Sequence, residues 1–255
     1  MSDDRIHPAA GVGFEVAVEH YERGRPTYPD DAVTYLVREL AIAEGRDVAE
    51  LGAGTGKFTE LIVHTGARIT GVEPVPAMRA ALERNCPTIR VVDGTAESIP
   101  AEDEAFDTVL AASAFHWFDG DRAAAELHRV LCPGAGLVAL WLESDRVAPW
   151  GDEVLALLEP LWQRTSHPSL VERRRGEPLE RHGGFAPVRR VEVAFDDAVD
   201  RDGTLAWFAS FSVVGALPAG ERTELMERLA AILDHHGVTT VQRTWRADLW
   251  VTRRV

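Results

Sequence analysis

Hydrophobic and polar positions predict a regular alternation of strands and helices over residues 31–145. Short apolar runs, which are typical of strands buried on both faces, occur at 47–51, 68–73, 89–92, 106–112 and 136–141. The stretches around them predict helices at 30–45, from the turn at 52–56 to 64, at 76–84 and at 121–131. Strands that alternate with helices in this way predict an α/β fold with a mostly parallel sheet covered on both faces.

The two ends of the chain have other patterns. Residues 1–10 are expected to be a flexible arm, 13–21 a short helix and 23–29 a linker interrupted by prolines. The C-terminal third predicts a helix at 150–163, a polar stretch to 181, a strand at 188–195, helices at 204–214 and 221–236, and a strand at 244–251. We expect the two late strands to pair antiparallel at the sheet edge. The chain then divides into an arm and lid segment (1–30), a core (31–145) and a cap with the closing strands (146–255).

Three glycines separate the first predicted strand from the next helix. In the sequence E-L-G-A-G-T-G at residues 50–56, Gly52, Gly54 and Gly56 occupy every second position. Residues without a Cβ atom let a backbone turn closely against a ligand, and free amides at a helix start favour an acidic ligand group. The dinucleotide motif G-x-G-x-x-G needs glycine where Lys57 stands, and the phosphate-binding motif G-x-x-x-x-G-K-[ST] needs Ser or Thr where Phe58 stands.

Two acidic residues lie in or at the end of the first two strands, near the edge where an open parallel sheet binds its ligands. Glu73 ends the second strand, about 20 residues after the glycine turn, where an acid accepts hydrogen bonds from ribose hydroxyls. The alternative is an exposed acid that precedes Pro74. Glu50 lies inside the first strand, where a buried carboxylate is costly unless it is hydrogen-bonded. We therefore expect Glu50 to bind turn amides or neighbouring polar groups.

The fourth strand ends in an aromatic turn at residues 112–118. Because aromatic faces attract cations, this turn could lie against a positively charged part of a ligand. The histidine side chain has an unperturbed pKa near neutrality, so His116 can act as a general base. The alternative is a packed, hydrogen-bonded histidine. The aromatic residues of the predicted cap likewise have two interpretations, an apolar acceptor pocket or the packed core of the cap: Trp150, Trp162, Trp207, Phe208 and Phe211.

Composition narrows the classes of ligand. The chain has 255 residues and a formal net charge of −14, which argues against a broad nucleic-acid surface because such binding neutralises phosphates. Cys86 and Cys132 have neither metal-ligand nor disulfide spacing, so we expect no metal and a reducing, cytoplasmic setting. We find no signal peptide and no run near the ~18 apolar residues of a membrane span. We therefore expect a small-molecule substrate, no nucleic acid, no membrane, and a monomer or homodimer.

Successive segments at 50–57, 73–74, 93–100, 114–118 and 129–134 are similar to the ordered motifs of one family. They resemble the class I S-adenosylmethionine (SAM)-dependent methyltransferase superfamily, in the branch of ubiquinone/menaquinone-type and trans-aconitate-like small-molecule methyltransferases. The match covers about residues 14–145 well and the C-terminal third loosely. It implies a Rossmann-like fold: a mostly parallel seven-stranded sheet with helices on both faces, an antiparallel C-terminal edge strand and a helical cap.

The resemblance also implies which residues contact SAM or its product S-adenosylhomocysteine. The glycine turn would pass under the methionine part, Glu73 would hold the ribose, and residues 95–96 would flank the adenine. Ser113 and Phe115 would border the sulfonium, and Tyr21 and Arg25 would close over the amino-acid end. The full set of implied cofactor contacts is Tyr21, Arg25, Glu50, Gly52, Ala53, Gly54, Glu73, Pro74, Thr95, Ala96, Glu97, Ser113 and Phe115.

The predicted function is methyl transfer from SAM to a small-molecule acceptor. Because a sulfonium is already an activated electrophile, alignment of the acceptor and exclusion of water supply much of the effect. A carboxylate acceptor needs no base, whereas a hydroxyl, an amine or a carbon acid needs one, and His116 is the best placed. Three alternatives stay open: a SAM-binding protein with a non-methylating or regulatory role, a NAD-dependent oxidoreductase opposed by Lys57, and an RNA methyltransferase opposed by the negative charge.

Overall fold

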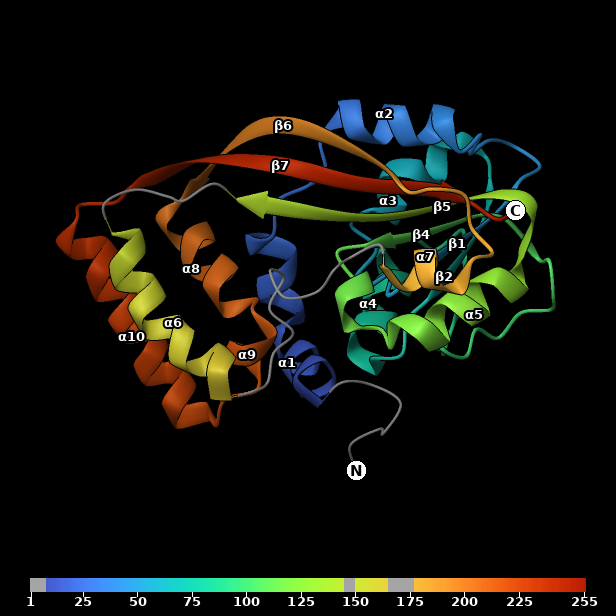
Figure 1. Ribbon diagram of the computed structural model, residues 1–255. Coiled ribbons are helices and arrows are strands. Elements are labelled where there is room, and N and C mark those ends of the chain that lie inside the picture. The colour runs from blue at the N-terminus through green and yellow to red at the C-terminus, as the bar shows by residue number, and fades with distance from the viewer. Residues whose placement is uncertain (1–7, 145–149, 165–176) are drawn as a thin grey trace. The chain divides into compact units, whose positions relative to one another are not determined.

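The computed structural model describes residues 8–144, 150–164 and 177–255 (Figure 1). Its strands form one seven-stranded sheet in the order β3-β2-β1-β4-β5-β7-β6. The strands are β1 (Asp47–Leu51), β2 (Arg68–Val72), β3 (Arg90–Val92), β4 (Phe106–Ala112), β5 (Leu131–Ser144), β6 (Arg189–Asp200) and β7 (Thr240–Arg253). The predicted fold class is confirmed, since β1 to β5 pair in parallel and helices alternate with them.

Strand β1 is the centre of the parallel part of the sheet. It pairs with β2 on one side, where Glu50 lies opposite Gly71, and with β4 on the other, where Glu50 lies opposite Leu110. The chain proceeds from β1 outward to β2 and β3 and then returns to add β4, so the strand order reverses between β1 and β4. In open parallel sheets, ligands bind beyond the carboxyl ends of the strands at such a reversal. The topology therefore predicts a ligand site at the residues that follow β1, β2 and β4.

Strand β5 begins five residues before the predicted start at 136. The pairing with β4 shifts between Phe106, opposite Leu131, and Thr108, opposite Gly136. Gly134 in this irregular segment has a φ of +78°, a conformation that favours glycine. The sequence Cys-Pro-Gly at 132–134 looks like a break between elements, but it lies within β5 as an irregular segment where the register shifts.

The described residues fall into two compact units. The larger, called the sheet unit, comprises residues 27–143, 177–193 and 246–255, and the smaller, called the helical unit, comprises 8–26, 144, 150–164 and 194–245. Helical elements of the sheet unit are α2 (Asp30–Glu39), α3 (Thr59–Ile62), α4 (Pro76–Asn85), α5 (Gly120–Val130), α7 (Glu177–His182) and the 3-10 turns Val63–Thr65 and Phe115–Trp117. The predicted domain boundaries at 30 and 145 stay a prediction.

The helical unit contains α1 (Pro8–Gly24), α6 (Gly151–Arg164), α8 (Arg201–Ala209), α9 (Ser212–Gly215) and α10 (Ala219–His235). Helix α1 is longer than the helix predicted at 13–21 and includes the end of the predicted flexible arm, while residues 1–7 lie outside the described residues. A Cβ atom on Gly13 would lie 2.1 Å from the carbonyl oxygen of Ser212, and one on Gly24 would lie 2.1 Å from the amide nitrogen of Trp207. These glycines therefore allow α1 to pack closely against α8 and α9.

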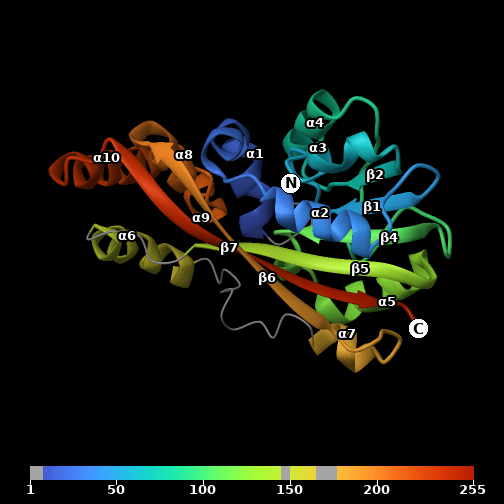
Figure 2. The ribbon, with the colours of Figure 1, turned by 90° about the horizontal axis from the view of Figure 1, so that it is seen from above.

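The last two strands complete the sheet. Beyond their ends, Phe185 and Arg254 form an antiparallel bridge, in agreement with the predicted antiparallel pair. Strand β6 is the outermost strand, and the C-terminal strand β7 lies between β5 and β6 (Figure 2). Within the part of the chain that the structure describes, no helix has both the length and the apolar character needed to cross a membrane.

Candidate cofactor site

The glycine turn after β1 has a backbone that only glycine adopts readily. Gly52, Gly54 and Gly56 have φ angles of +63°, +58° and +96°. A Cβ atom on Gly52 would lie 2.6 Å from that of Ala114, and one on Gly56 would lie 2.8 Å from Cδ1 of Leu82. At Gly54 an added Cβ meets nothing within 4 Å among the described residues. Two glycines thus allow close packing, and the middle one leaves room for a ligand.

Glu73 holds this turn from the end of β2. Its Oε2 atom accepts a hydrogen bond from the Gly54 amide at 2.8 Å, and its Oε1 atom accepts one from the Val75 amide at 2.9 Å. The side chain is buried, with 5% of its surface exposed, so the alternative of an exposed acid does not hold. Burial raises the pKa of Glu73 to about 7, although the two amide hydrogen bonds act in the opposite direction. The acid and the glycine turn therefore form one unit.

The turn is also fixed to the neighbouring strand through its backbone. The amides of Gly52 and Ala53 both donate to the carbonyl oxygen of Val72, at 2.8 and 3.3 Å. Pro74, the next predicted contact, is partly exposed directly after Glu73. The sequence predicted that one ligand contacts Gly52, Ala53, Gly54 and Glu73. The structure places these residues close together.

Glu50 lies beneath the turn and is 1% exposed. It accepts a hydrogen bond from the Thr59 hydroxyl at the start of α3. Burial raises the pKa of Glu50 to about 8, the Thr59 hydrogen bond lowers it and the nearby charge of Glu73 raises it. Glu50 therefore joins β1 to the helix that follows the turn, and its partner is a side chain, one of the two possibilities expected from the sequence.

The structure adds Thr55, which is not among the predicted cofactor contacts. It lies between Gly54 and Gly56 and is 0% exposed. Its hydroxyl has no hydrogen-bond partner among the described residues, whereas its carbonyl oxygen accepts a hydrogen bond from Asn85 Nδ2 at 2.9 Å. A buried hydroxyl without a partner is costly in a protein interior. The only sequence signal for Thr55 is its place inside the glycine motif.

The segment after β3 forms a tight turn. The backbone amides and carbonyl groups of Thr95 and Ser98 bond reciprocally, at 3.3 and 3.2 Å. Ala96 is 3% exposed and belongs to the core of the sheet unit. The carboxylate of Glu97 accepts a hydrogen bond from the Asp119 amide at 2.7 Å, just before α5. Glu97 therefore links this turn to the start of α5, and the assignment of Thr95 and Ala96 to the adenine stays a prediction.

Ser113 directly follows β4 and has an unusual backbone. Its φ is +54°, which is rare for a residue with a side chain, and its amide donates to the Leu140 carbonyl oxygen at 2.7 Å. Its hydroxyl lies 3.1 Å from the hydroxyl of Tyr28, with which it shares a hydrogen bond. Tyr28 was not among the predicted site residues, although it belongs to the motif Tyr21-x-x-x-Arg25-Pro26-x-Tyr28-Pro29. Its ring packs edge-on against Phe58, with centroids 5.1 Å apart.

The aromatic turn after β4 contains the predicted base. Phe115 is 5% exposed and packs in the core against Phe118 and Trp141. His116 Nδ1 accepts a hydrogen bond from the Trp141 indole nitrogen at 3.2 Å. A neutral imidazole that accepts at Nδ1 carries its proton on Nε2. This hydrogen bond favours donation from Nε2 over proton abstraction, and the base role of His116 stays a prediction.

Tyr21 and Arg25 belong to the helical unit. The Arg25 guanidinium lies 5.4 Å from the Tyr21 ring centre and 5.2 Å from that of Phe211, and Arg25 Nε donates to the Ser210 hydroxyl at 2.9 Å. The assignment of Tyr21 and Arg25 to the amino-acid end of a cofactor stays a prediction. The predicted cap aromatics form or border the packed core of the helical unit, which favours the structural interpretation: Trp150, Trp162, Trp207, Phe208 and Phe211.

Comparisons with known proteins identify the family. Residues 49–139 match a methyltransferase domain family. Over 229 residues the chain is 34% identical to an uncharacterized methyltransferase of Mycobacterium tuberculosis, covering 88% of this chain and 87% of that protein. Over 239 residues it is 35% identical to an uncharacterized methyltransferase of Schizosaccharomyces pombe, covering 93% and 92%. The chain belongs to the class I SAM-dependent methyltransferase superfamily.

A solved structure supports this methyltransferase fold. A protein from Anaeromyxobacter dehalogenans, provisionally assigned as a type II methyltransferase, superposes with a TM-score of 0.58 at 25% identity, covering 90% of this chain and 97% of that one. The site residues fit the cofactor of the superfamily. The turn has open space at Gly54, a buried acid lies at the end of β2, and the Thr55 hydroxyl is buried without a partner in the described part of the chain.

Proposed function

We propose that this methyltransferase transfers the methyl group of SAM to a small-molecule acceptor, and that SAM lies across the ends of β1, β2 and β4. The observation that carries the proposal is the hydrogen bond between Glu73 and the Gly54 amide. It joins a buried acid to a glycine turn that is open at its middle residue, at the point where the strand order reverses. This combination suits a ligand with a ribose and a charged amino-acid end.

Each group of residues then has a distinct role toward the cofactor. When bound, SAM supplies a methyl group already activated by its sulfonium. Glu73 accepts hydrogen bonds from the ribose hydroxyls, Gly52 to Gly54 lie along the methionine part, and Thr95 with Ala96 flank the adenine. Ser113, held by Tyr28, presents a hydroxyl oxygen beside the glycine turn, because its neighbour Ala114 lies against Gly52. These contacts orient the methyl group and exclude water.

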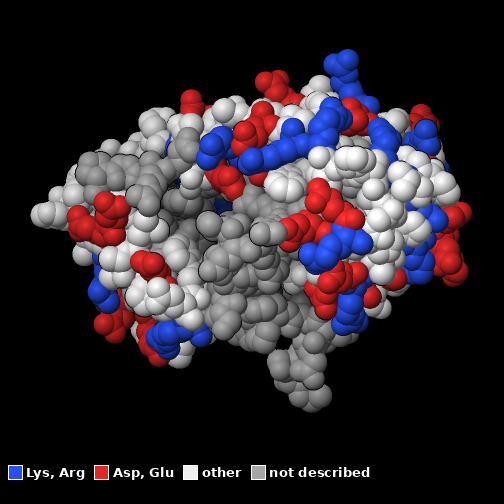
Figure 3. Space-filling view, viewed as in Figure 1, with Lys and Arg blue, Asp and Glu red and all other residues white. Residues whose placement is uncertain are grey.

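The acceptor is proposed to be a small molecule for an electrostatic reason. The chain carries a net charge of −14, which repels the phosphates of a nucleic acid. On the face shown in Figure 3, the basic side chains of the described residues lie beside acidic ones.

The hydrogen bond of His116 bears on the acceptor atom. Because His116 Nδ1 accepts from Trp141, an acceptor atom that is already nucleophilic, such as a carboxylate oxygen, fits this site better than one that needs His116 as a base.

Two experiments test the proposal. Calorimetric titration of the purified protein with SAM, S-adenosylhomocysteine and NAD should show binding of both adenosyl ligands and none of NAD. Binding of NAD alone would contradict the proposed cofactor.

Incubation with methyl-labelled SAM and either a small-molecule extract or total RNA then tests the acceptor class. Label should move from SAM into another compound of the small-molecule extract, and label that enters RNA alone would refute that class.

A further inference from the structure

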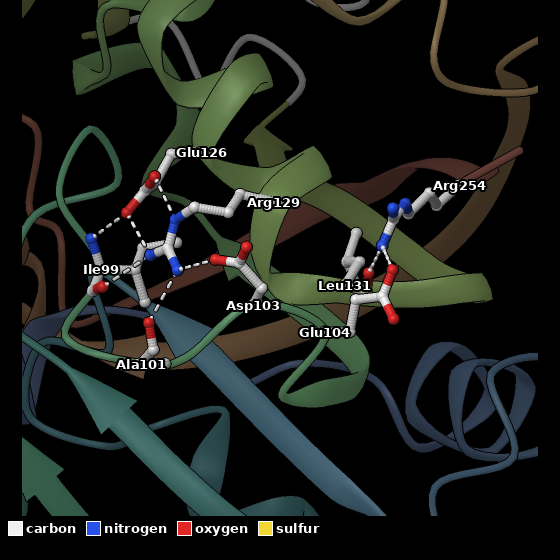
Figure 4. Close-up of polar contacts among 8 residues, drawn as sticks. All are labelled: Ile99, Ala101, Asp103, Glu104, Glu126, Arg129, Leu131 and Arg254. Atoms are coloured by element: carbon white, nitrogen blue, oxygen red, sulfur yellow. Dashed lines mark hydrogen bonds and ion pairs between the residues drawn. The ribbon is translucent and has the colours of Figure 1, made fainter.

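The turn at residues 95–98 continues into a segment that is held by the last turns of α5. The amide of Ile99 donates to Glu126 Oε1 at 2.8 Å, and the Ile99 carbonyl oxygen accepts from Arg129 Nη2 at 3.1 Å (Figure 4). Both polar backbone atoms of one residue are therefore bound by two side chains of one helix. Ile99 is 4% exposed and lies in the same core cluster as Ala96.

The two side chains are held by each other. Arg129 Nε donates to Glu126 Oε2 at 2.9 Å and Arg129 Nη2 donates to Glu126 Oε1 at 2.7 Å, a bidentate arrangement. The hydrogen bonds from Arg129 lower the pKa of Glu126, so the carboxylate stays ionised near neutrality. Arg129 Nη1 also donates to the Ala101 carbonyl oxygen at 2.8 Å and to Asp103 at 2.9 Å. Arg129 thus reaches three residues of the 99–103 segment at once.

Further contacts fix the segment on either side of this pair. Glu104 forms an ion pair with Arg254 at 3.1 Å, and its amide donates to the Arg129 carbonyl oxygen at 2.9 Å. On the other side, Glu97 accepts from the Asp119 amide at 2.7 Å. Within the turn at 95–98, Glu97 is therefore held at the start of α5, and Ile99, directly after the turn, is held near the end of α5. A shift of Ile99 would change the position of Thr95 and Ala96 directly, because only three peptide units separate Ala96 from Ile99.

We propose that the Glu126–Arg129 pair positions the adenine-binding turn, and that Arg129 acts through Ile99 as a positioning residue for cofactor recognition. The proposal rests on the proposed function, since it takes Thr95 and Ala96 as the residues that flank the adenine. Neither Glu126 nor Arg129 touches the cofactor in this scheme. Their effect is on the geometry of the turn, and so on the affinity for SAM and the preference for its base.

The test measures cofactor affinity in variants of the pair. Arg129→Gln removes the bidentate contact, Arg129→Lys keeps the charge and part of the hydrogen bonding, and Glu126→Gln keeps an acceptor oxygen for the Ile99 amide. Arg181→Gln is the matched control, because Arg181 forms an ion pair with Asp121 at the exposed start of α5 without reaching the turn. Calorimetry with S-adenosylhomocysteine should show affinity about tenfold weaker for Arg129→Gln, less weakened for the two conservative variants, and unchanged for Arg181→Gln.

A second measurement separates positioning from general stabilisation. The analogue S-inosylhomocysteine, in which oxygen replaces the adenine amino group, reports base recognition. If the pair positions the turn, the preference of the protein for S-adenosylhomocysteine over this analogue should fall in the Arg129 variants, and the Ile99 amide should exchange hydrogen faster. A lower unfolding free energy with unchanged affinity and unchanged preference would overturn the proposal. If Arg129→Gln does not fold, the same comparison is made with Arg129→Lys and Glu126→Gln.

The failure of the proposed function gives a different result. In that case the wild-type protein itself would not bind S-adenosylhomocysteine, and the positioning proposal would fall with the proposed function. Wild-type binding that all three variants retain, with the same preference for adenine, would refute the positioning role alone.

Discussion

The indole N–H of Trp141 donates a hydrogen bond to Nδ1 of His116 across 3.2 Å. Trp141 comes from β5 and His116 from the turn after β4, so the bond joins the ends of two neighbouring parallel strands. A histidine oriented in this way offers an N–H group at Nε2 and not a lone pair. The chemical character of the residue is therefore set by a neighbour 25 positions away in the chain.

The first prediction concerns this tautomer. Nitrogen NMR of the uncharged His116 imidazole should show its proton on Nε2, because Nδ1 accepts a hydrogen bond from Trp141. Trp141→Phe removes the donor, and the spectrum should then move toward a mixture of tautomers. A wild-type spectrum with the proton on Nδ1 would contradict the hydrogen bond and support the predicted base role of His116.

The second prediction concerns the acid at the end of β2. Glu73→Gln removes the negative charge that this side chain carries above its pKa of about 7, and replaces one acceptor oxygen with a donor that faces a backbone amide. Hydrogen bonds to charged groups contribute about 1.5–3 kcal/mol each, so S-adenosylhomocysteine affinity should fall roughly tenfold to a hundredfold in calorimetric titration. Glu60→Gln, an exposed acid on α3, is the control and should bind like wild type. Equal affinity in the Glu73 variant would remove this residue from the ribose.

The third prediction concerns pH. Burial raises the pKa of Glu73 to about 7 and that of Glu50 to about 8, from 4.5. Between about pH 5 and about pH 8 these two carboxyl groups therefore bind more protons in the folded protein than in the unfolded chain, and their contribution to the free energy of unfolding should fall as pH rises. The stabilisation is complete below the unfolded pKa and is lost as pH passes through the folded values.

Urea denaturation over a pH series checks this dependence. Glu50→Gln keeps an oxygen that can accept from Thr59 and removes the titration, so the slope of stability against pH should become shallower. A variant with the wild-type slope would show that Glu50 does not titrate in this range.

The fourth prediction separates the conformation of the turn from its contact with the cofactor. Gly54→Ala places a methyl group in open space, so we expect only the cost of a left-handed residue, about 1–2 kcal/mol in unfolding free energy. Gly134→Ala is the matched control, since its φ is +78° and an added Cβ also meets nothing within 4 Å in the described chain. Both variants should lose similar stability, but Gly54→Ala alone should weaken S-adenosylhomocysteine binding. Equal binding by the two variants would contradict the role of Gly54.

Much of the fold was predictable from local pattern. The bounds of β1 and β4 agree with the predicted 47–51 and 106–112, because each is a short apolar run buried on both faces. The ends of longer elements were not predictable. In α1, Gly13 and Gly24 look like breakers in the sequence, but their missing side chains allow close packing with α9 and α8. Helix α7 falls in what the sequence analysis gives only as a polar stretch, because its single buried residue, Leu179, gives no periodic signal.

The candidate site was predictable where residues are close in sequence or at equivalent strand ends. Gly54 and Glu73 belong to motifs at the ends of adjacent parallel strands, so the topology brings them together. Tyr28 next to Ser113 was not predictable, since 85 residues separate them and no pattern indicates that the two hydroxyl groups meet. The contacts of Arg129 with the 99–103 segment were missed for the same reason, because they depend on the packing of α5.

Lys57, which distinguished this turn from a dinucleotide motif, is also the single lysine of the chain. It is partly exposed directly after Gly56, at the proposed cofactor site. Every other side-chain cation is an arginine or a histidine, so a reagent selective for ε-amines can react with one side chain only. Loss of labelling at Lys57 in the presence of S-adenosylhomocysteine would therefore be a footprint of the occupied turn that needs no mutagenesis.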